Sequence, residues 1–261
     1  MQINDTLSEA YYHLALIDEK GQSWRMMSRN LTRAVTLNPD HYAARLKLAQ
    51  FLILSGRLDK AQSEVDFVLR FSPNNLDAKV INGGILLRKK DYVAALSEAN
   101  KVLVVDESHI EAITLKVMTY EGLQEVDSAL DVVNRALQMR PDDLSLNLLS
   151  LKINMEIKDK AAIEKDYKRL IKIFPDNHQF AYLLVGYYVG EGREQDALKL
   201  LQDVVAQNKE DVGPKLILVD YLIEKNSSLA EVMLERFIQE APSEASFYHK
   251  LAILKIQQKY C

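Results

Sequence analysis

The chain of 261 residues has a formal net charge of −4, with 48% hydrophobic and 27% charged residues, a composition that is ordinary for a folded protein. This acidic balance argues against nucleic acid and anionic membranes as partners, and no stretch is apolar and long enough to insert into a membrane. The only cysteine, Cys261, excludes an internal disulfide and a thiolate metal site.

The start of the chain, MQINDTLSEA, lacks the basic region and apolar run of a signal peptide. The sequence therefore leaves the compartment open between the cytoplasm and a bacterial periplasm or cell envelope.

A period of 34 residues organises the chain. Pro39, Pro73, Pro141 and Pro175 lie 34, 68 and 34 residues apart, and Glu107 in VVDESH occupies the slot left between the second and the third. Within each period, two stretches carry apolar residues at helical spacing. This pattern predicts a stack of helix pairs.

In chain order, residues 1–7 are predicted to be the tail of a preceding repeat, because residues 3–5 align with residues 37–39. Seven repeats are predicted at 8–41, 42–75, 76–109, 110–143, 144–177, 178–211 and 212–244. The last repeat is one residue short in the turn at 226–228, and Pro214 is expected in the first turn of its helix.

Residues 245–261 are predicted to be the first helix of an incomplete further repeat. This helix keeps Phe247, Leu251 and Ile256 and is too apolar for a solvent-facing cap. We therefore expect the chain to be a piece of a longer array, or its ends to be covered by another molecule.

Small residues recur at fixed slots where paired helices must approach closely. Ala61, Ala95, Ala129, Ala197 and Ala230 share one slot, and Ala15, Ala49, Gly83 and Ala252 share another. Gly56 and Gly192 fall in the turns between paired helices, where glycine accepts a left-handed conformation.

Together with Tyr92 and the closing prolines, these residues resemble the tetratricopeptide repeat over essentially the whole chain. The resemblance implies an all-α fold, a right-handed α-solenoid of helix-turn-helix repeats, with a concave groove lined by the first helix of each pair. The phrases GRLDKAQSEVDFVLRFSPNNLDAKV and GREQDALKLLQDVV also resemble long bacterial arrays linked to cell-envelope assembly and polysaccharide export.

No pattern in the sequence indicates a catalytic, cofactor or metal site. The nucleotide-binding and hydrolase motifs GxxxxGK[ST], GxGxxG, GxSxG and HExxH are absent. The five histidines lack a second histidine or a cysteine at helical spacing, which a metal site on a helix needs. We therefore predict no enzyme activity and no cofactor; an enzyme stays an alternative only through a catalytic domain elsewhere.

The resemblance places the groove lining at the fifth, ninth and twelfth slots of the first helices. The groove residues predicted from these slots are Tyr12, Leu46, Ile53, Val80, Leu87, Met118, Leu148, Met155, Tyr182 and Val189. They lack the Lys, Arg and Asn ladder with which some family members hold a peptide carboxylate. An apolar groove favours an amphipathic helix or a hydrophobic segment of a protein partner, and flexible methionines tolerate varied partners.

Two alternatives to groove binding remain. These side chains can pack between adjacent repeats, or the chain can be an assembly module that self-associates through the ends of the array, within a larger envelope or polysaccharide-export protein. The leading hypothesis is a non-enzymatic scaffold that binds a peptide or helical segment.

One slot that holds leucine in other repeats is polar in three consecutive ones, at Asn82, Lys116 and Ser150. An unbonded polar group buried there would cost about 1–3 kcal/mol. The pattern indicates either a polar track through the array or a local rotation in which Lys116 extends its ammonium to solvent.

Overall fold

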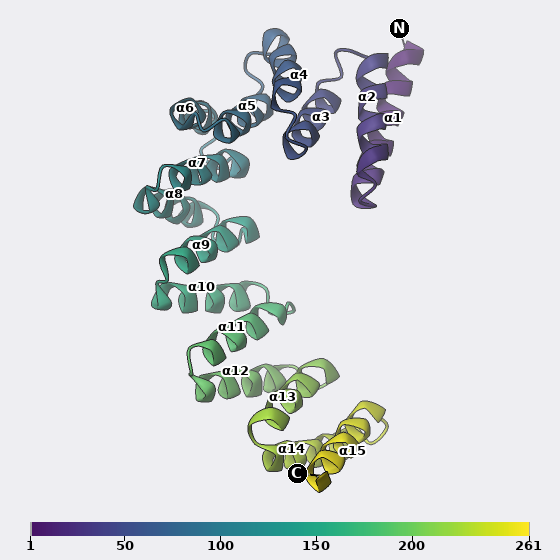
Figure 1. Cartoon of the computed structure of the whole chain (residues 1–261), viewed down its shortest axis with the longest axis vertical. Coiled ribbons are helices and arrows are strands. Elements are labelled where there is room, and N and C mark those ends of the chain that lie inside the picture. Colours follow the sequence, from purple (N-terminus) through teal and green to yellow (C-terminus); the bar gives the residue numbers. More distant parts are fainter. Residues whose placement is uncertain (1, 261) are drawn as a thin grey trace. The chain divides into compact units, whose positions relative to one another are not determined.

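Helices are the only regular elements in the computed structural model, which describes residues 2–260 (Figure 1). The all-α class expected from the periodicity is therefore confirmed for the described residues. Contacts divide the chain into two compact units, the first ending at Glu156 and the second beginning at Ile157.

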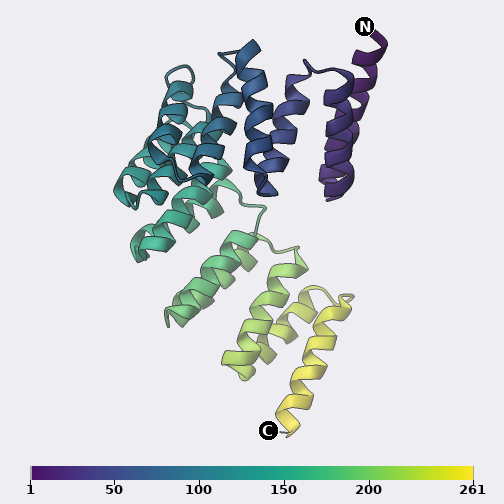
Figure 2. The same cartoon turned by 45° about the horizontal axis from the view of Figure 1, so that its top comes forward.

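The first unit contains nine helices: α1 (Gln2–Lys20), α2 (Trp24–Leu37), α3 (Tyr42–Leu54), α4 (Leu58–Phe71), α5 (Leu76–Arg88), α6 (Tyr92–Leu103), α7 (Ile110–Gly122), α8 (Val126–Met139) and α9 (Leu144–Ile157), whose last residue falls past the boundary. The second unit contains α10 (Lys160–Ile173), α11 (Gln179–Gly190), α12 (Glu194–Gln207), α13 (Val212–Lys225), α14 (Ser227–Glu240) and α15 (Ala245–Tyr260). Several helices that follow one another lie side by side, such as α1 and α2 next to the N-terminus (Figure 2) and α5 and α6.

The boundary between the units falls inside the predicted fifth repeat, 144–177, between α9 and α10. The sequence did not predict this division, because the 34-residue period runs through it without a gap. Residues 155–161, which span the boundary, are all exposed. The connection between α9 and α10 therefore contributes no buried side chain.

Small side chains occupy the contact between paired helices, as their periodic recurrence predicted. Ala61, Ala95, Ala129, Ala197 and Ala230 are fully buried. At Gly83 an added Cβ would lie 2.3 Å from Cδ2 of Leu115, so this close approach of α5 and α7 admits only glycine without a shift. Ala252 is the exception: it is exposed, because no described helix covers that side of α15.

The turn inside each helix pair needs one residue with a left-handed backbone, and this residue recurs every 34 positions. Two are the predicted glycines, Gly56 and Gly192, both with φ of 73°. The others are Gln22 (φ 55°), Lys90 (φ 63°), Gln124 (φ 63°) and Lys158 (φ 60°). The pair α13/α14 lacks this residue because Asn226 alone joins the two helices, and its side chain accepts a hydrogen bond from the amide of Leu229 at 3.1 Å.

Several helices begin at a residue whose side chain accepts a hydrogen bond from an otherwise unpaired backbone amide. Asn75, Asp91 and Asp159 accept from the amides of Ala78, Ala94 and Ala162 at 2.8, 3.1 and 3.0 Å. Pro214 lies in the first turn of α13, as predicted, where its missing amide removes no helical hydrogen bond.

Residues 2–7, which the sequence predicts to be the tail of a preceding repeat, lie in α1, because this helix begins at Gln2 and continues to Lys20 without a break; Met1 lies outside the described residues. No glycine or proline interrupts residues 2–7. The buried hydroxyl of Ser8 donates a hydrogen bond to the carbonyl oxygen of Ala34 at 2.8 Å.

The three polar side chains in the leucine slot have different surroundings. Asn82 accepts a hydrogen bond from Gln62 at 2.9 Å, and Lys116 donates one to Asn100 at 2.7 Å. Burial, followed by the nearby charge of Arg135, lowers the pKa of Lys116. Ser150 is buried. Asn82 and Lys116 thus bond to neighbouring second helices, which argues against one continuous polar track.

Candidate functional site

A groove runs along the first helices of the first unit, and eight of the ten predicted groove residues line it. Its α1–α5 section is lined by Tyr12, Leu46 and Val80. Its central section, with a cavity volume of about 640 Å³, is lined by Ile53, Val80, Leu87, Met118 and Leu148. Its α9 section is lined by Leu148 and Met155. Val80 lines both the α1–α5 and the central section, and Leu148 lines both the central and the α9 section. The three sections together are called the α1–α9 groove.

Exposure varies along this groove. Met118, Leu148 and Met155 are 42%, 41% and 48% exposed, whereas Ile53, Val80 and Leu87 are half-buried. The prediction that Leu46 offers apolar surface to a partner is wrong, because this side chain is buried in the hydrophobic core around α3 and α4. The exposed apolar surface is therefore concentrated on α7 and α9.

The other two predicted residues, Tyr182 and Val189, lie on α11 in the second unit, where both are half-buried. Burial, together with the charge of Asp211, raises the pKa of the Tyr182 phenol.

Gly84 leaves free space on the wall of the central section. It lines the groove beside Leu87 and Met118, and a Cβ added to it would meet no atom within 4 Å. Neither the backbone nor the packing thus requires glycine at this position, in contrast to its neighbour Gly83.

Charged side chains border the apolar lining. Glu111 and Asp77 have side chains that are 73% and 75% exposed, and His109 lies between them, 3.2 Å from the Glu111 carboxylate and 3.9 Å from that of Asp77. Lys152 of α9 donates to both carboxylate oxygens of Glu121 at 2.8 and 3.0 Å. Burial opposes the charge on Lys152, but its contacts with Glu121 and Glu156 outweigh burial and raise its pKa.

Sequence reasoning missed one slot that also lines the groove. This slot lies three residues before the fifth slot and holds Ala43, Asp77, Glu111 and Ser145. Residues three apart on a helix share a face, so this spacing was the available signal. Asp77 and Glu111 in this slot add carboxylates to a groove whose predicted lining is largely aliphatic.

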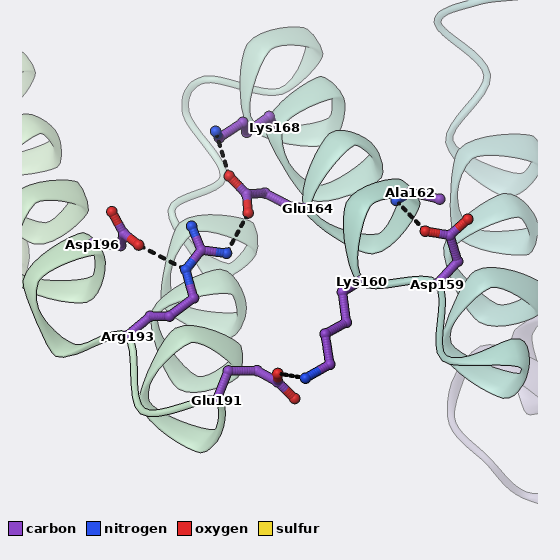
Figure 3. Close-up of polar contacts among 8 residues, drawn as sticks. All are labelled: Asp159, Lys160, Ala162, Glu164, Lys168, Glu191, Arg193 and Asp196. Carbon is purple, nitrogen blue, oxygen red and sulfur yellow. Dashed lines mark hydrogen bonds and ion pairs between the residues drawn. The ribbon is translucent and has the colours of Figure 1, made fainter.

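The second unit contains an ion network around Glu164 and Arg193 (Figure 3). Glu164 of α10 accepts hydrogen bonds from Nη1 of Arg193 at 2.5 Å and from Nζ of Lys168 at 2.6 Å. These bonds lower the pKa of Glu164 to about 2. Arg193 also donates to Asp196 at 2.7 Å, and Lys160 pairs with Glu191. Such mutual pairing keeps Glu164 ionised near neutral pH, which suits a structural role better than proton transfer.

Over the part of the chain that the structure describes, no three side chains of the metal-binding types gather into a group that would hold an ion. In the same residues, every helix is too short or too polar to cross a lipid bilayer.

A family model, several known proteins and several solved structures are similar to parts of this chain. A family model for the tetratricopeptide repeat matches residues 29–80. The DnaJ protein P58IPK homolog B of Oryza sativa subsp. japonica is 25% identical over 227 residues, which cover 74% of this chain and 48% of that protein. The lipopolysaccharide assembly protein B of Haemophilus influenzae is 23% identical over 189 residues, which cover 67% of this chain and 48% of that protein.

This chain thus spans about half the length of the curated relatives that it matches. Among solved structures, the type IV pilus biogenesis factor PilW aligns with a TM-score of 0.59 at 17% identity, over 81% of this chain and 98% of that one. At this identity the structural likeness establishes a common fold.

Proposed function

Because this chain belongs to the tetratricopeptide-repeat family, whose fold typically serves as a non-enzymatic scaffold for protein–protein interaction, we propose that its α1–α9 groove binds an amphipathic helix of a protein partner. The observation that carries the proposal is the apolar surface of Met118, Leu148 and Met155, each more than two-fifths exposed within a groove. Apolar side chains that are exposed together in one patch are typical of protein–protein interaction sites.

A helix fits this groove better than an extended peptide. An extended peptide brings unpaired backbone amides and carbonyls, which must find partners in the groove. The lining offers few: Thr114 and Ser145 are its neutral polar residues in the central section, and Lys152 is already paired with Glu121. A helix satisfies its own backbone and needs only an apolar face, which matches the lining.

The carboxylates at the border of the groove favour a partner helix that carries basic residues beside its apolar face. Asp77, Glu111 and Glu156 place carboxylates along the three sections. Of the lysines there, Lys152 pairs with Glu121 and Lys47 pairs with Glu19 at 2.7 Å. Among the lysines and arginines that line the groove, this leaves Arg88 without an ion pair to a described residue. Charge at a rim sets partner choice and association rate more than affinity.

The experiment starts from a displayed library of amphipathic helical peptides selected on the whole chain, followed by fluorescence anisotropy with the recovered peptide. The double variant Leu87→Glu, Met155→Glu should weaken binding about a hundredfold, because two apolar contacts are replaced by charge. Circular dichroism should show the same helicity as the parent. Equal affinity of parent and variant, or recovery of no helical peptide, would refute the proposal.

Gly84→Leu provides a sharper variant, because it fills the groove without disturbing the core. The added side chain meets no neighbour at its Cβ, and leucine favours a helix over glycine by up to about 1 kcal/mol. We expect binding to be lost while the melting temperature holds or rises. Ser97→Leu, on the exposed face of α6, adds the same side chain away from the groove and should leave binding unchanged.

Exposed apolar side chains on α1 and α15 favour a second candidate function, assembly through these faces. Leu14 and Ile17 are 47% and 65% exposed on α1, and Ile253 and Ile256 are 37% and 59% exposed on α15. If copies associate through them, light scattering should give a mass that rises with concentration and falls in Leu14→Glu, Ile17→Glu. A constant monomer mass would reject this candidate.

A further inference from the structure

A row of arginines on α2 is unlike the other charged surfaces of this protein. Arg25, Arg29 and Arg33 recur every four residues, so they share one face of the helix. All three are exposed, and α2 contains no aspartate or glutamate. A chain with net charge −4 thus presents a purely basic helix in its first pair.

These arginines make no ion pair within residues 2–260. Elsewhere in the chain arginines are commonly paired with carboxylates, as for Arg45, Arg135, Arg140, Arg169, Arg193 and Arg236. The facing helix α1 does not neutralise the row, because Asp18 instead accepts a hydrogen bond from Asn30 at 2.7 Å. The guanidinium groups therefore keep their hydrogen-bond donors for a ligand.

Two of the arginines line a groove between α1 and α2, which we call the α1/α2 groove. Its lining is Leu7, Tyr11, Arg29, Thr32, Arg33, Thr36 and Leu37, and its cavity volume is about 500 Å³. The guanidinium carbon of Arg33 lies 5.0 Å from the centroid of the Tyr11 ring, a distance at which a cation and an aromatic face attract. Apolar lining and fixed positive charge thus lie side by side.

The two threonines indicate what kind of ligand fits. The Thr32 hydroxyl donates to the carbonyl of Ser28 at 2.8 Å, and the Thr36 hydroxyl donates to the carbonyl of Thr32 at 2.7 Å. Their hydrogens are committed to the helix, so towards a ligand these oxygens act as acceptors. A peptide supplies N–H donors for them, whereas a fully ionised phosphate group supplies none.

We propose that the α1/α2 groove binds an acidic segment of a partner protein, in which carboxylates alternate with apolar side chains. The carboxylates pair with Arg29 and Arg33, whose planar guanidinium groups match a carboxylate with two hydrogen bonds. The apolar side chains contact Leu7 and Leu37. An extended polyanion such as nucleic acid is disfavoured, because α1 carries Asp5, Glu9, Asp18 and Glu19 against a single lysine.

This site is separate from the α1–α9 groove. Tyr11 lines the one and Tyr12 the other, and consecutive residues on a helix point about 100° apart. The charge preference is also opposite, because the α1–α9 groove is bordered by carboxylates. The scaffold would thus hold two partner segments of opposite charge, and failure of either site leaves the other untouched.

The test selects short random peptides displayed on phage against the whole chain, then measures the recovered peptide by fluorescence anisotropy. We expect recovered sequences to combine Asp or Glu with apolar residues. Their affinity should fall about tenfold or more in Arg29→Glu, Arg33→Glu and decrease with added salt. Arg70→Glu, which changes an exposed arginine on α4, is the matched control and should bind as the parent does.

Parallel measurements use a single-stranded DNA oligonucleotide and vesicles containing phosphatidylserine. Either of these binding in an Arg29- and Arg33-dependent manner, in place of the peptides, overturns the proposal. So does a selection that returns no peptide dependent on these two arginines. Circular dichroism of the double variant excludes unfolding, which is not expected because both side chains are exposed.

Discussion

Replacing Glu164 by glutamine tests whether the ion network of the second unit stabilises that unit. Glu164 is bonded by Arg193 and Lys168 (Figure 3), and its pKa is about 2 instead of the ordinary 4.5. The guanidinium of Arg193 is fixed from a second side, because its carbon lies 4.4 Å from the centroid of the Tyr188 ring. Glutamine keeps the shape of the side chain and removes its charge.

The magnitude follows from the two pKa values. A carboxyl group with a pKa of about 2 in the folded chain and 4.5 in the unfolded chain contributes at most about 3 kcal/mol at neutral pH. The side chains of Arg193 and Lys168 are 40% and 62% exposed, so water screens both interactions. We therefore expect Glu164→Gln to lower the free energy of unfolding by about 1–2 kcal/mol.

The pH dependence has a definite sign. Because the pKa of Glu164 is lower in the folded chain, the unfolded chain takes up a proton first as the pH falls. The stabilisation is complete above about pH 4.5 and is lost as the pH falls from there through about pH 2. The difference between the parent and Glu164→Gln should therefore shrink between about pH 7 and about pH 3.

Urea denaturation at these two pH values measures the effect, with circular dichroism as the signal. The single tryptophan, Trp24, lies in the first unit, so its fluorescence follows that unit separately and should not respond. Glu235→Gln, an exposed glutamate on α14, serves as the control. A loss of stability that is equal at both pH values, or no loss at neutral pH, would refute the reasoning.

Two further predictions concern packing and turns in the first unit. Ala95→Leu should lower the free energy of unfolding by about 1–3 kcal/mol, since Ala95 is fully buried between helices. The control Ala10→Leu, at an exposed site on α1, should not lower it. Equal melting temperatures for the two variants would show that the residues are assigned to the wrong positions of the repeat. Lys90→Gly should raise the free energy of unfolding by about 1 kcal/mol, because Lys90 has a φ of 63°, which is unfavourable for any residue with a Cβ atom. Gly56→Ala should lower the free energy of unfolding in the same urea titration. No change in either variant would contradict the idea that these turns strain a residue with a Cβ.

The sequence alone determined the helix pairs and their period. In a repeat stack each unit contacts mainly its neighbours, so the contacts that matter are close in sequence and leave a periodic trace. The buried alanines at Ala95 and Ala129 and the glycine turns at Gly56 and Gly192 followed from that trace.

Other features were decided only by the tertiary structure. The division after Glu156 and the left-handed backbone at Lys158 are not encoded in residue type, because a turn can impose its conformation on lysine when the flanking helices are packed. Leu46 and Leu148 occupy the same slot of the repeat, yet Leu46 is buried and Leu148 is 41% exposed. The slot fixes which side of a helix a residue occupies, whereas its exposure depends on the side chains of neighbouring helices.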